Sequence, residues 1–276
     1  MFSKIAIIGT GLLGASIGLA MRRCVPECRI VGIGRRLETL EIAQRIGAVD
    51  TVSLSIADGV KGCEFVIVCT PVGHIADQVL ETAQAADNSP IITDVGSTKQ
   101  MICETLESQL PLPNGCRFLG SHPIAGSEKT GPEAASETLF DDRVVVLTPT
   151  ASTDAETLDT LRNFWQMLGA NVVCMSPDEH DRTLALTSHL PHTLSAILTT
   201  VCDRQTYGEF CGTGYESMTR LAEGSPEIWI DILMSNRTAL CQAIDTFAKS
   251  CNQLRASLEK NDAEAVLQFL KTAQEQ

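Results

Sequence analysis

The chain has 276 residues, enough for two domains that each bury a hydrophobic core. Its net charge of −13 argues against nucleic acid or an anionic membrane as a partner, because both require basic surface patches. The 11 cysteines are odd in number and form no CxxC pair, which argues against a secreted disulfide framework and predicts reduced thiols in the cytoplasm.

The first apolar run covers residues 5–20 and follows Lys4, as in a signal sequence, but four glycines interrupt it. We therefore expect no export, and we expect no transmembrane helix because uninterrupted apolar runs of about 18 residues are missing from the sequence. Residues 4–8 are instead typical of a short buried strand, and residues 12–23 have the spacing of a helix.

The turn at residues 9–14 reads Gly-Thr-Gly-Leu-Leu-Gly and matches GxGxxG. A strand before it, a helix after it and a second strand at residues 29–33 form the βαβ context that makes this motif specific for a dinucleotide. The first glycine permits a tight turn, the second clears space for the pyrophosphate, and the third lets helix and strand pack closely. We assign cofactor binding to Gly9, Gly11, Leu12, Leu13 and Gly14.

The end of the second predicted strand indicates which dinucleotide binds. NAD sites place Asp or Glu about 20 residues after the turn, where the carboxylate bonds the ribose hydroxyls. Here Gly34 takes that place and is followed by Arg35 and Arg36, so a 2′-phosphate would meet guanidinium groups and no carboxylate. We therefore predict NADP, with NAD as the alternative if both arginines belong only to a solvated turn.

Strand-like and helix-like segments alternate up to about residue 175. Helical patterns cover residues 37–46, with Gly47 as a C-cap, and residues 75–86; apolar strands are predicted at residues 65–69, 91–93, 118–120, 144–147 and 171–174. This α/β alternation predicts a Rossmann-type domain over residues 1–176, with a doubly wound, mostly parallel sheet. Thr70 and Pro71 end one of these strands at the edge where ligands bind, and we assign them to the cofactor site.

Two later loops carry polar residues after predicted strands. Residues 94–99 contain Ser97, and residues 121–127 contain His122. A histidine at such a position can exchange a proton with a substrate hydroxyl near neutral pH. Ser97 could in addition cap the helix that we expect to begin near Lys99. We interpret His122 and Ser97 as the candidate catalytic pair, with Ser97 also close to the cofactor.

From residue 177 the pattern is entirely helical, which predicts an all-α domain over residues 177–276. The segment Ser188-His189-Leu190-Pro191-His192 places two histidines on one helix face, and Pro191 predicts a kink. Further ligands at metal-site spacing are missing from the sequence around them, so we predict no metal. The pair His180-Asp181 is interpreted as structural.

A narrow apolar stripe runs along the last part of the chain. Its members recur every seven residues, with apolar residues at the intervening positions: Leu233, Leu240, Ile244, Phe247, Cys251, Leu254 and Leu258. Such a stripe is typical of one face of a helix bundle, or of a helix that packs against a second subunit. We favour the second interpretation and expect a homodimer.

In this order, the motifs resemble the prephenate/arogenate dehydrogenase family over about residues 3–240. They are residues 9–14, 94–99, 122–128, 188–192, 218–220 and 229–232. The resemblance implies a cytoplasmic enzyme of tyrosine biosynthesis that oxidises and decarboxylates a small cyclohexadienol while a nicotinamide cofactor accepts hydride. It also implies a homodimer formed by the helical domain, in agreement with the apolar stripe.

The resemblance implies a role for each matched position. His122 would take the proton of the ring C4 hydroxyl, Ser97 would help to hold that hydroxyl, and Arg220 would bind a substrate carboxylate. The rest of the substrate pocket would comprise Ser188, His189, His192 and Trp229, with Gly126 in a rim of residues 126–129. One departure is Ser217, at a position where the family often has Asp, and the choice between prephenate and arogenate stays open.

Plainer interpretations of these residues also stay open. His189 and His192 could be packing residues, and Arg220 could form a structural ion pair with Glu216 or Glu223. At the level of function, the alternatives are another dehydrogenase with a Rossmann and a helical domain, of the β-hydroxyacid or imine reductase class, and an NADP-sensing regulator without activity. The first usually relies on a helical-domain lysine, whereas the lysines of residues 177–276 all come late, at Lys249, Lys260 and Lys271.

Overall fold

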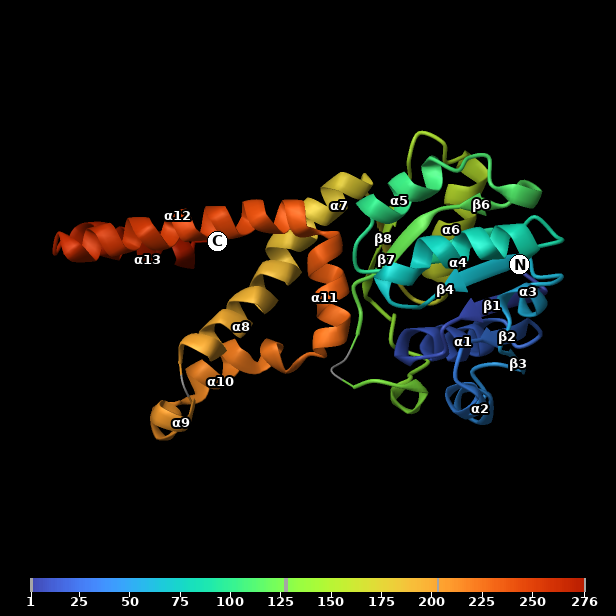
Figure 1. The fold of residues 1–276 in the computed structure, drawn as a ribbon, viewed down its shortest axis with the longest axis horizontal. Helices are drawn as coiled ribbons and strands as arrows, with labels where there is room; N and C mark the ends of the chain where they lie inside the picture. Colours follow the sequence, from blue (N-terminus) through green and yellow to red (C-terminus); the bar gives the residue numbers. More distant parts are fainter. Residues whose placement is uncertain (1, 127–128, 203, 276) are drawn as a thin grey trace. The chain divides into compact units, whose positions relative to one another are not determined.

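A computed structural model describes residues 2–126, 129–202 and 204–275 (Figure 1). Contacts group the chain into two compact units, of which the first comprises residues 1–181 with 224–235 and the second residues 182–223 with 236–276. This grouping differs from the predicted division at residues 176/177, because the segment 224–235 joins the first unit although it lies between two parts of the second in the sequence.

The first unit is built on a six-stranded sheet with the order β3-β2-β1-β4-β5-β6, and every neighbouring pair is parallel. The chain reverses its direction of winding between β1 and β4, which is the switch point where open α/β sheets bind ligands at the carboxyl ends of their strands. The predicted Rossmann-type sheet is therefore confirmed. The strands are β1 (Lys4–Ile8), β2 (Arg29–Ile33), β3 (Thr51–Ser53), β4 (Phe65–Val68), β5 (Ile91–Asp94) and β6 (Arg117–Phe118).

Helices cover both faces of this sheet (Figure 1). The helices predicted at residues 12–23, 37–46 and 75–86 are observed with bounds that differ by three residues or fewer, and Gly47 has a φ of +79°, as a glycine that terminates a helix requires. The helices of this sheet region are α1 (Leu12–Cys24), α2 (Leu37–Arg45), α3 (Ile56–Gly59), α4 (Val72–Ala85), α5 (Gln100–Glu107) and α6 (Ala155–Met167), with short 3₁₀ turns η1 (Pro113–Gly115) and η2 (Pro132–Ala134).

A second sheet of three strands has the order β7-β8-β9, with β7 (Gly120–Pro123), β8 (Val144–Thr148) and β9 (Asn171–Cys174). Strand β7 is antiparallel to β8, and β8 is parallel to β9. His122 lies within β7 and pairs with Val146, so the expectation that it sits in a loop after a strand at residues 118–120 is wrong. Pairing with β8 makes this segment a strand although it has no apolar alternation of its own.

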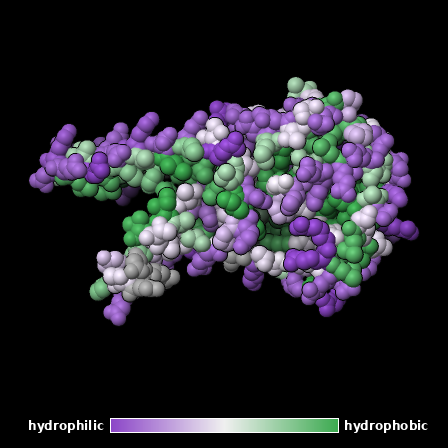
Figure 2. Space-filling model, in the orientation of Figure 1, coloured by the Kyte–Doolittle hydropathy of each residue, from purple (hydrophilic) through white to green (hydrophobic). Residues whose placement is uncertain are grey.

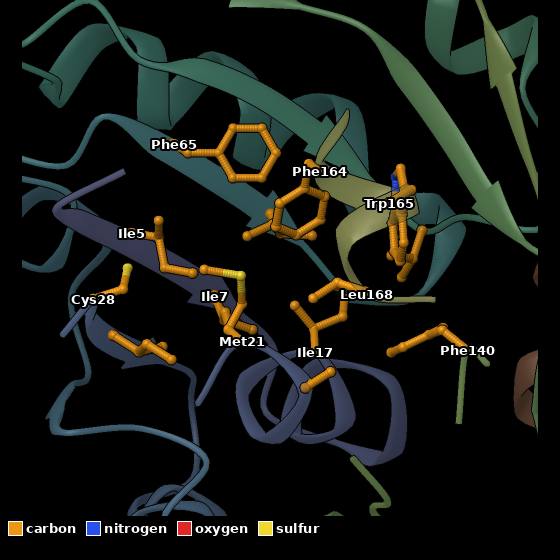
Figure 3. Packing of buried hydrophobic residues seen from close by; sticks show 14 of the residues in the cluster. Ile5, Ile7, Ile17, Met21, Cys28, Phe65, Phe140, Phe164, Trp165 and Leu168 are labelled. Carbon is orange, nitrogen blue, oxygen red and sulfur yellow. The ribbon is translucent and has the colours of Figure 1, made fainter. Parts of the chain in front are cut away.

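The core of the first unit has one apolar layer on each face of the large sheet. Successive side chains of a strand point to opposite faces, so Ile5 and Ile7 join one layer while Ala6 and Ile8 join the other. In the first layer, Phe65 packs against Phe164 at 4.7 Å between ring centroids (Figure 3). Both faces are covered, which explains why the strands read as continuous apolar runs rather than as alternating patterns.

The second unit is entirely helical within the residues that the structure describes. The predicted kink coincides with a π-helical turn, in which the N–H of Leu190 bonds to the carbonyl of Ala185 just before Pro191. The elements from residue 177 on are α7 (Pro177–Leu184), the π turn η3 (Ala185–His189), α8 (Leu190–Val201), α9 (Arg204–Tyr207), η4 (Gly208–Phe210), α10 (Thr213–Thr219), η5 (Arg220–Glu223), α11 (Pro226–Ser235), α12 (Arg237–Glu259) and α13 (Ala263–Gln274).

The apolar stripe is divided between two helices. Leu233 belongs to α11, which ends at Ser235 and groups with the first unit, whereas α12 carries the stripe from Leu240 to Leu258. Helices α12 and α13 pack against each other as a hairpin. Each helix in the described part of the chain is too short or too polar to cross a membrane.

Candidate active site

The glycine-rich turn joins β1 to α1 in the geometry that a dinucleotide requires. Gly9 has a φ of +93°, and a Cβ added there would lie 2.6 Å from the carbonyl oxygen of Cys69. A Cβ on Gly14 would lie 2.0 Å from the carbonyl oxygen of Gly9, so this glycine lets the helix approach the turn. A Cβ on Gly11, in contrast, would have no atom within 4 Å, which leaves space at the start of α1.

The start of α1 has the polar character of an anion site. Within the described part of the chain no side chain caps the helix, its first turn contains no acidic residue, and Leu12 and Leu13 are half-buried there. The hydroxyl of Thr10 is buried and has no hydrogen-bond partner among the described residues. Free N–H groups, a positive helix end and an unpaired hydroxyl fit the diphosphate of a dinucleotide, and residues 9–14 would hold it.

Arg35 and Arg36 follow the end of β2, the strand next to β1. The turn is tied to this strand, since the N–H of Gly9 donates to the carbonyl of Ile33 at 2.7 Å. Both arginine side chains are exposed, and neither forms an ion pair with another described residue. The guanidinium groups are therefore available to an anionic ligand at this edge.

Thr70 and Pro71 lie beside the glycine-rich turn, as the sequence predicted. The methyl group of Thr70 would be 3.0 Å from a Cβ on Gly9, and its hydroxyl donates to Oε1 of Gln78 at 2.6 Å. Pro71 is the residue that precedes α4. Both residues are thus at the carboxyl edge of the sheet, next to the point where the strand order reverses.

Asp94 connects the Ser97 loop to the strand that carries His122. Its carboxylate pairs with the ammonium group of Lys99, and both side chains are fully buried. Oδ1 of Asp94 also accepts from the N–H of Ser121 at 3.2 Å, while the hydroxyl of Ser121 donates to the carbonyl of Asp94 at 2.5 Å. Ser97 is half-buried in the middle of the loop that these bonds hold.

His122 is buried and belongs to a chain of three side chains. Its Nδ1 lies 2.8 Å from Nε2 of His180, and Nδ1 of His180 lies 2.7 Å from Oδ1 of Asp181. Burial lowers the pKa of His180, although its hydrogen bond to Asp181 acts in the opposite direction. The hydrogen-bonded series His122–His180–Asp181 resembles the arrangement that orients a histidine base in hydrolases with a Ser-His-Asp triad.

Asp181 also caps α5, a role that the sequence suggested for Ser97. Its two carboxylate oxygens accept from the backbone N–H groups of Lys99 at 2.8 Å and Gln100 at 3.0 Å, which open α5. His180 and Asp181, interpreted from the sequence as structural, therefore contact both the candidate base and the Ser97 loop. Their position at the start of a helix gave no signal of this contact, because His122 is 58 residues away in the sequence.

Two more of the predicted substrate residues lie in the first unit. Trp229, on α11, is half-buried and packs against the apolar layer that includes α4. The hydroxyl groups of Thr98 and Ser235 lie 2.9 Å apart and connect the end of α11 to the Ser97 loop. Gly126 is exposed shortly after β7, and residues 127 and 128 of its predicted rim lie outside the described residues.

The remaining predicted residues lie in the second unit. His189 is buried in the π turn, where its Nδ1 is 3.0 Å from Nδ2 of Asn236. His192 is buried on α8, and this burial lowers its pKa. Ser188 is half-buried in the same π turn. These three positions put polar groups around a local irregularity of the helix, a common feature of functional sites.

Arg220 is at the first position of η5 and is exposed. The segment is fixed to α8, since the N–H of Ala222 donates to the hydroxyl of Ser195 at 3.0 Å. Ser195 is one turn after His192, so this bond connects the arginine segment to the histidine helix within the unit. Among the described residues Arg220 forms no ion pair with Glu216 or Glu223, which speaks against the structural alternative.

Two family models match the chain. The one described as "Prephenate dehydrogenase, nucleotide-binding domain" matches residues 17–174, and the one described as "Prephenate dehydrogenase, dimerization domain" matches residues 176–272. Together they cover most of both units.

Individual relatives agree with the family models. The chain is 35% identical to a prephenate dehydrogenase of Bacillus subtilis over 285 residues, which cover 100% of the chain and 75% of that protein. It is 31% identical to a cyclohexadienyl dehydrogenase of Zymomonas mobilis, with 99% and 94% covered. The crystal structure of prephenate dehydrogenase from Aquifex aeolicus, in complex with hydroxyphenyl propionate and NAD+, matches with a TM-score of 0.92 and 30% identity over 99% of this chain and 96% of that one.

Proposed function

Because this chain belongs to the prephenate dehydrogenase family, we propose that it catalyses the oxidative decarboxylation of prephenate or arogenate in tyrosine biosynthesis. The products are 4-hydroxyphenylpyruvate or tyrosine, together with CO2 and the reduced nicotinamide cofactor. The observation that carries the proposal is the buried His122, which a second histidine and a carboxylate orient in a unit that also has a dinucleotide turn.

The reaction needs one base and accurate orientation. When bound, the oxidised nicotinamide supplies the acceptor for the hydride that leaves C4 of the ring. His122 accepts the proton of the C4 hydroxyl through Nε2, so that the electron pair left on the oxygen forms a C=O bond as hydride departs. The C–C bond to the ring carboxylate then breaks, CO2 leaves, the electrons of that bond pass through the ring to the oxygen, and His122 returns the proton to this oxygen of the aromatic product.

Ser97 and Arg220 hold the substrate during this step. The hydroxyl of Ser97, in the loop anchored by Asp94, bonds the C4 oxygen and restricts its position relative to the base. Arg220 binds a substrate carboxylate through two parallel N–H bonds, since it is exposed and keeps its guanidinium unpaired among the described residues. Ser188, His189, His192, Trp229 and Gly126 complete the proposed substrate site.

We further propose NADP as the preferred cofactor, with NAD as a weaker alternative. Arg35 and Arg36 offer two exposed guanidinium groups at the end of β2, where Gly34 provides no carboxylate to repel a 2′-phosphate.

Outside the site, we propose a cytoplasmic homodimer formed through the helical hairpin. Its support is the family model for a dimerization domain and the apolar residues that α12 and α13 expose.

The test is an assay of prephenate and arogenate, each with NADP and with NAD, that measures both reduced cofactor and CO2. We expect one CO2 for each reduced cofactor, with at least one of the two substrates, and a higher kcat/KM with NADP. Reduced cofactor without CO2 would indicate a simple alcohol dehydrogenase. Cofactor binding without either product would indicate a sensor, and both outcomes contradict the proposal.

A further inference from the structure

We infer that His180 is a positioning residue that, with Asp181, fixes which ring nitrogen of His122 carries the proton. The inference rests on the proposed role of His122 as the base, and it adds to that role two residues that no motif singled out. Three side chains carry it: His122 in β7, and His180 and Asp181 in α7. They form a continuous chain with spacings of 2.8 Å and 2.7 Å.

The direction of each hydrogen bond follows from Asp181. Its two carboxylate oxygens already accept two backbone N–H groups at the start of α5. An ionised carboxylate only accepts, so Nδ1 of His180 must donate to it. In a neutral imidazole the other nitrogen is then an acceptor, and Nε2 of His180 takes the N–H of Nδ1 from His122. The lone pair of His122 is thereby placed on Nε2, as the proposed base requires.

The surroundings of His180 favour the neutral ring that this scheme needs. The side chain is fully buried, and burial lowers its pKa. The charged groups that face it are Asp181 on its own helix and Lys99 and Asp94 from the β5–α5 segment; His122 faces it from β7. Lys99 and Asp94 neutralise each other as a buried pair, so the carboxylate of Asp181 is the remaining charge that orients the ring.

The scheme matters most when His122 holds the substrate proton. The imidazolium then donates from Nδ1 to His180, which spreads its positive charge toward Asp181 without moving a second proton. If His122 instead carried its neutral proton on Nε2, it could only donate to the substrate hydroxyl and could not accept. Because Asp181 also caps α5, the same carboxylate aligns the base and anchors the loop with Ser97.

Two variants separate alignment from packing. His180→Phe keeps a ring of similar size but removes the acceptor, whereas His180→Gln keeps an oxygen that can accept from His122. We expect His180→Phe to lower kcat by about 10²-fold and His180→Gln by about 10-fold or less, with KM for substrate and cofactor changed by less than about threefold. Glu179→Gln, on the exposed side of the same helix, serves as the control and should leave kcat unchanged.

Nitrogen NMR of the five histidines in the 276-residue chain tests the tautomer without substrate. We expect His122 in the wild type to carry its proton on Nδ1, and His180→Phe to lose that preference. A wild-type His122 protonated on Nε2, or a kcat for His180→Phe within about twofold of wild type, would overturn the inference. If His180→Phe does not fold, the wild-type spectrum and His180→Gln still decide it. A failure of the proposed function appears differently, as a wild type that makes no CO2.

Discussion

His122 is buried, and its Nδ1 lies 2.8 Å from Nε2 of His180, a contact that fits the proposed role of His122 as the base. We expect His122→Asn to lower kcat by about 10² or more with a modest change in substrate KM, because asparagine can bond a hydroxyl but cannot take its proton. Steady-state kinetics with the better substrate measure both constants.

The control for this variant is cofactor affinity, since the glycine-rich turn is untouched in His122→Asn. We expect an unchanged Kd for the cofactor in a fluorescence titration and an unchanged melting temperature. A turnover number equal to that of the wild type would remove His122 from its proposed role, whatever the structure of the site.

Cofactor choice is also argued at the scale of single residues. Gly34 has an ordinary backbone conformation, and a Cβ there would lie 3.4 Å from Cδ2 of Leu40, so a larger residue fits with little strain. We expect Gly34→Asp to shift the ratio of kcat/KM from NADP toward NAD by about 10-fold or more, because the carboxylate would bond the ribose hydroxyls and repel a 2′-phosphate. Gly34→Asn adds a similar side chain without charge and is the matched control. If both variants change the ratio equally, charge is not what selects the cofactor.

Sequence motifs located most candidate residues because each motif is local. The glycine-rich turn and Ser97 follow strands that can be recognised by their apolar runs, whereas His122 is recognised by its local motif alone; all of them lie in the first unit. His180 and Asp181 could not be assigned in the same way. They are neighbours in the sequence at the start of a helix. Their contact with the candidate base forms only when folding brings His180 next to His122 of β7, which is 58 residues away in the sequence.

At the scale of elements, a methyl group added at Gly14 or at Gly11 in the β1–α1 turn should have different effects, the first on protein stability and the second on cofactor affinity. We expect Gly14→Ala to destabilise the protein by about 2 kcal/mol or more, because its Cβ would lie 2.0 Å from the carbonyl oxygen of Gly9, which is rigid backbone. Gly11→Ala should leave the stability of the protein unchanged within about 0.5 kcal/mol, because its Cβ meets no atom within 4 Å. Chemical denaturation compares the two variants directly.

Gly11→Ala, which should leave stability unchanged, should instead weaken cofactor binding. In Gly11→Ala the methyl group enters the space that we assign to the pyrophosphate, so we expect a folded protein whose Kd for the cofactor rises by about 10-fold or more. Calorimetric titration of the folded variant measures this. Normal binding in Gly11→Ala would mean that the dinucleotide does not cross the turn at this point.

The elements themselves were predictable where burial imposes a pattern and unpredictable where pairing does. Strands such as β1 and β4 have both faces covered, and their apolar runs identify them. Strand β7 contains Ser121, His122 and Pro123 and has no such run, because its conformation comes from pairing with β8. Pro191 predicts a kink but not the π turn that precedes it, since a proline predicts a lost hydrogen bond but not how the helix compensates.

At the scale of the whole molecule, the sequence shows a change from α/β to helical patterns near residue 176, but not the path of the chain back to the first unit. Segment 224–235 reads as one more amphipathic helix, and its assignment depends on contacts between α11 and α4. Helix α11 includes Trp229 and Ile232, which pack into the core of the first unit. The apolar stripe predicted from the sequence therefore includes Leu233 of α11, which packs against α4, and Leu240 of α12, which packs against α13.

The helical hairpin exposes more apolar surface than a stable monomer would be expected to leave in water. Leu258 is 60% exposed, Leu267 52% and Leu270 55%, and hydrophobic residues reach the surface along the hairpin (Figure 2). A groove of about 610 Å³ between α12 and α13, lined by Leu254 and Phe269 among others, offers space for side chains of a second copy. These features support a two-fold interface formed by this hairpin.

We expect Leu258→Glu to weaken the proposed dimer by about 10²-fold or more, because a two-fold axis repeats the loss of each buried leucine and brings two new charges into the interface. Light scattering over a dilution series should give the mass of a monomer at concentrations where the wild type has twice that mass. Glu259→Gln, one residue further in an exposed pair with Arg255 at 3.6 Å, is the control and should remain dimeric. A Leu258→Glu variant that keeps the wild-type mass at every concentration would show that the exposed leucines of the hairpin do not form the interface.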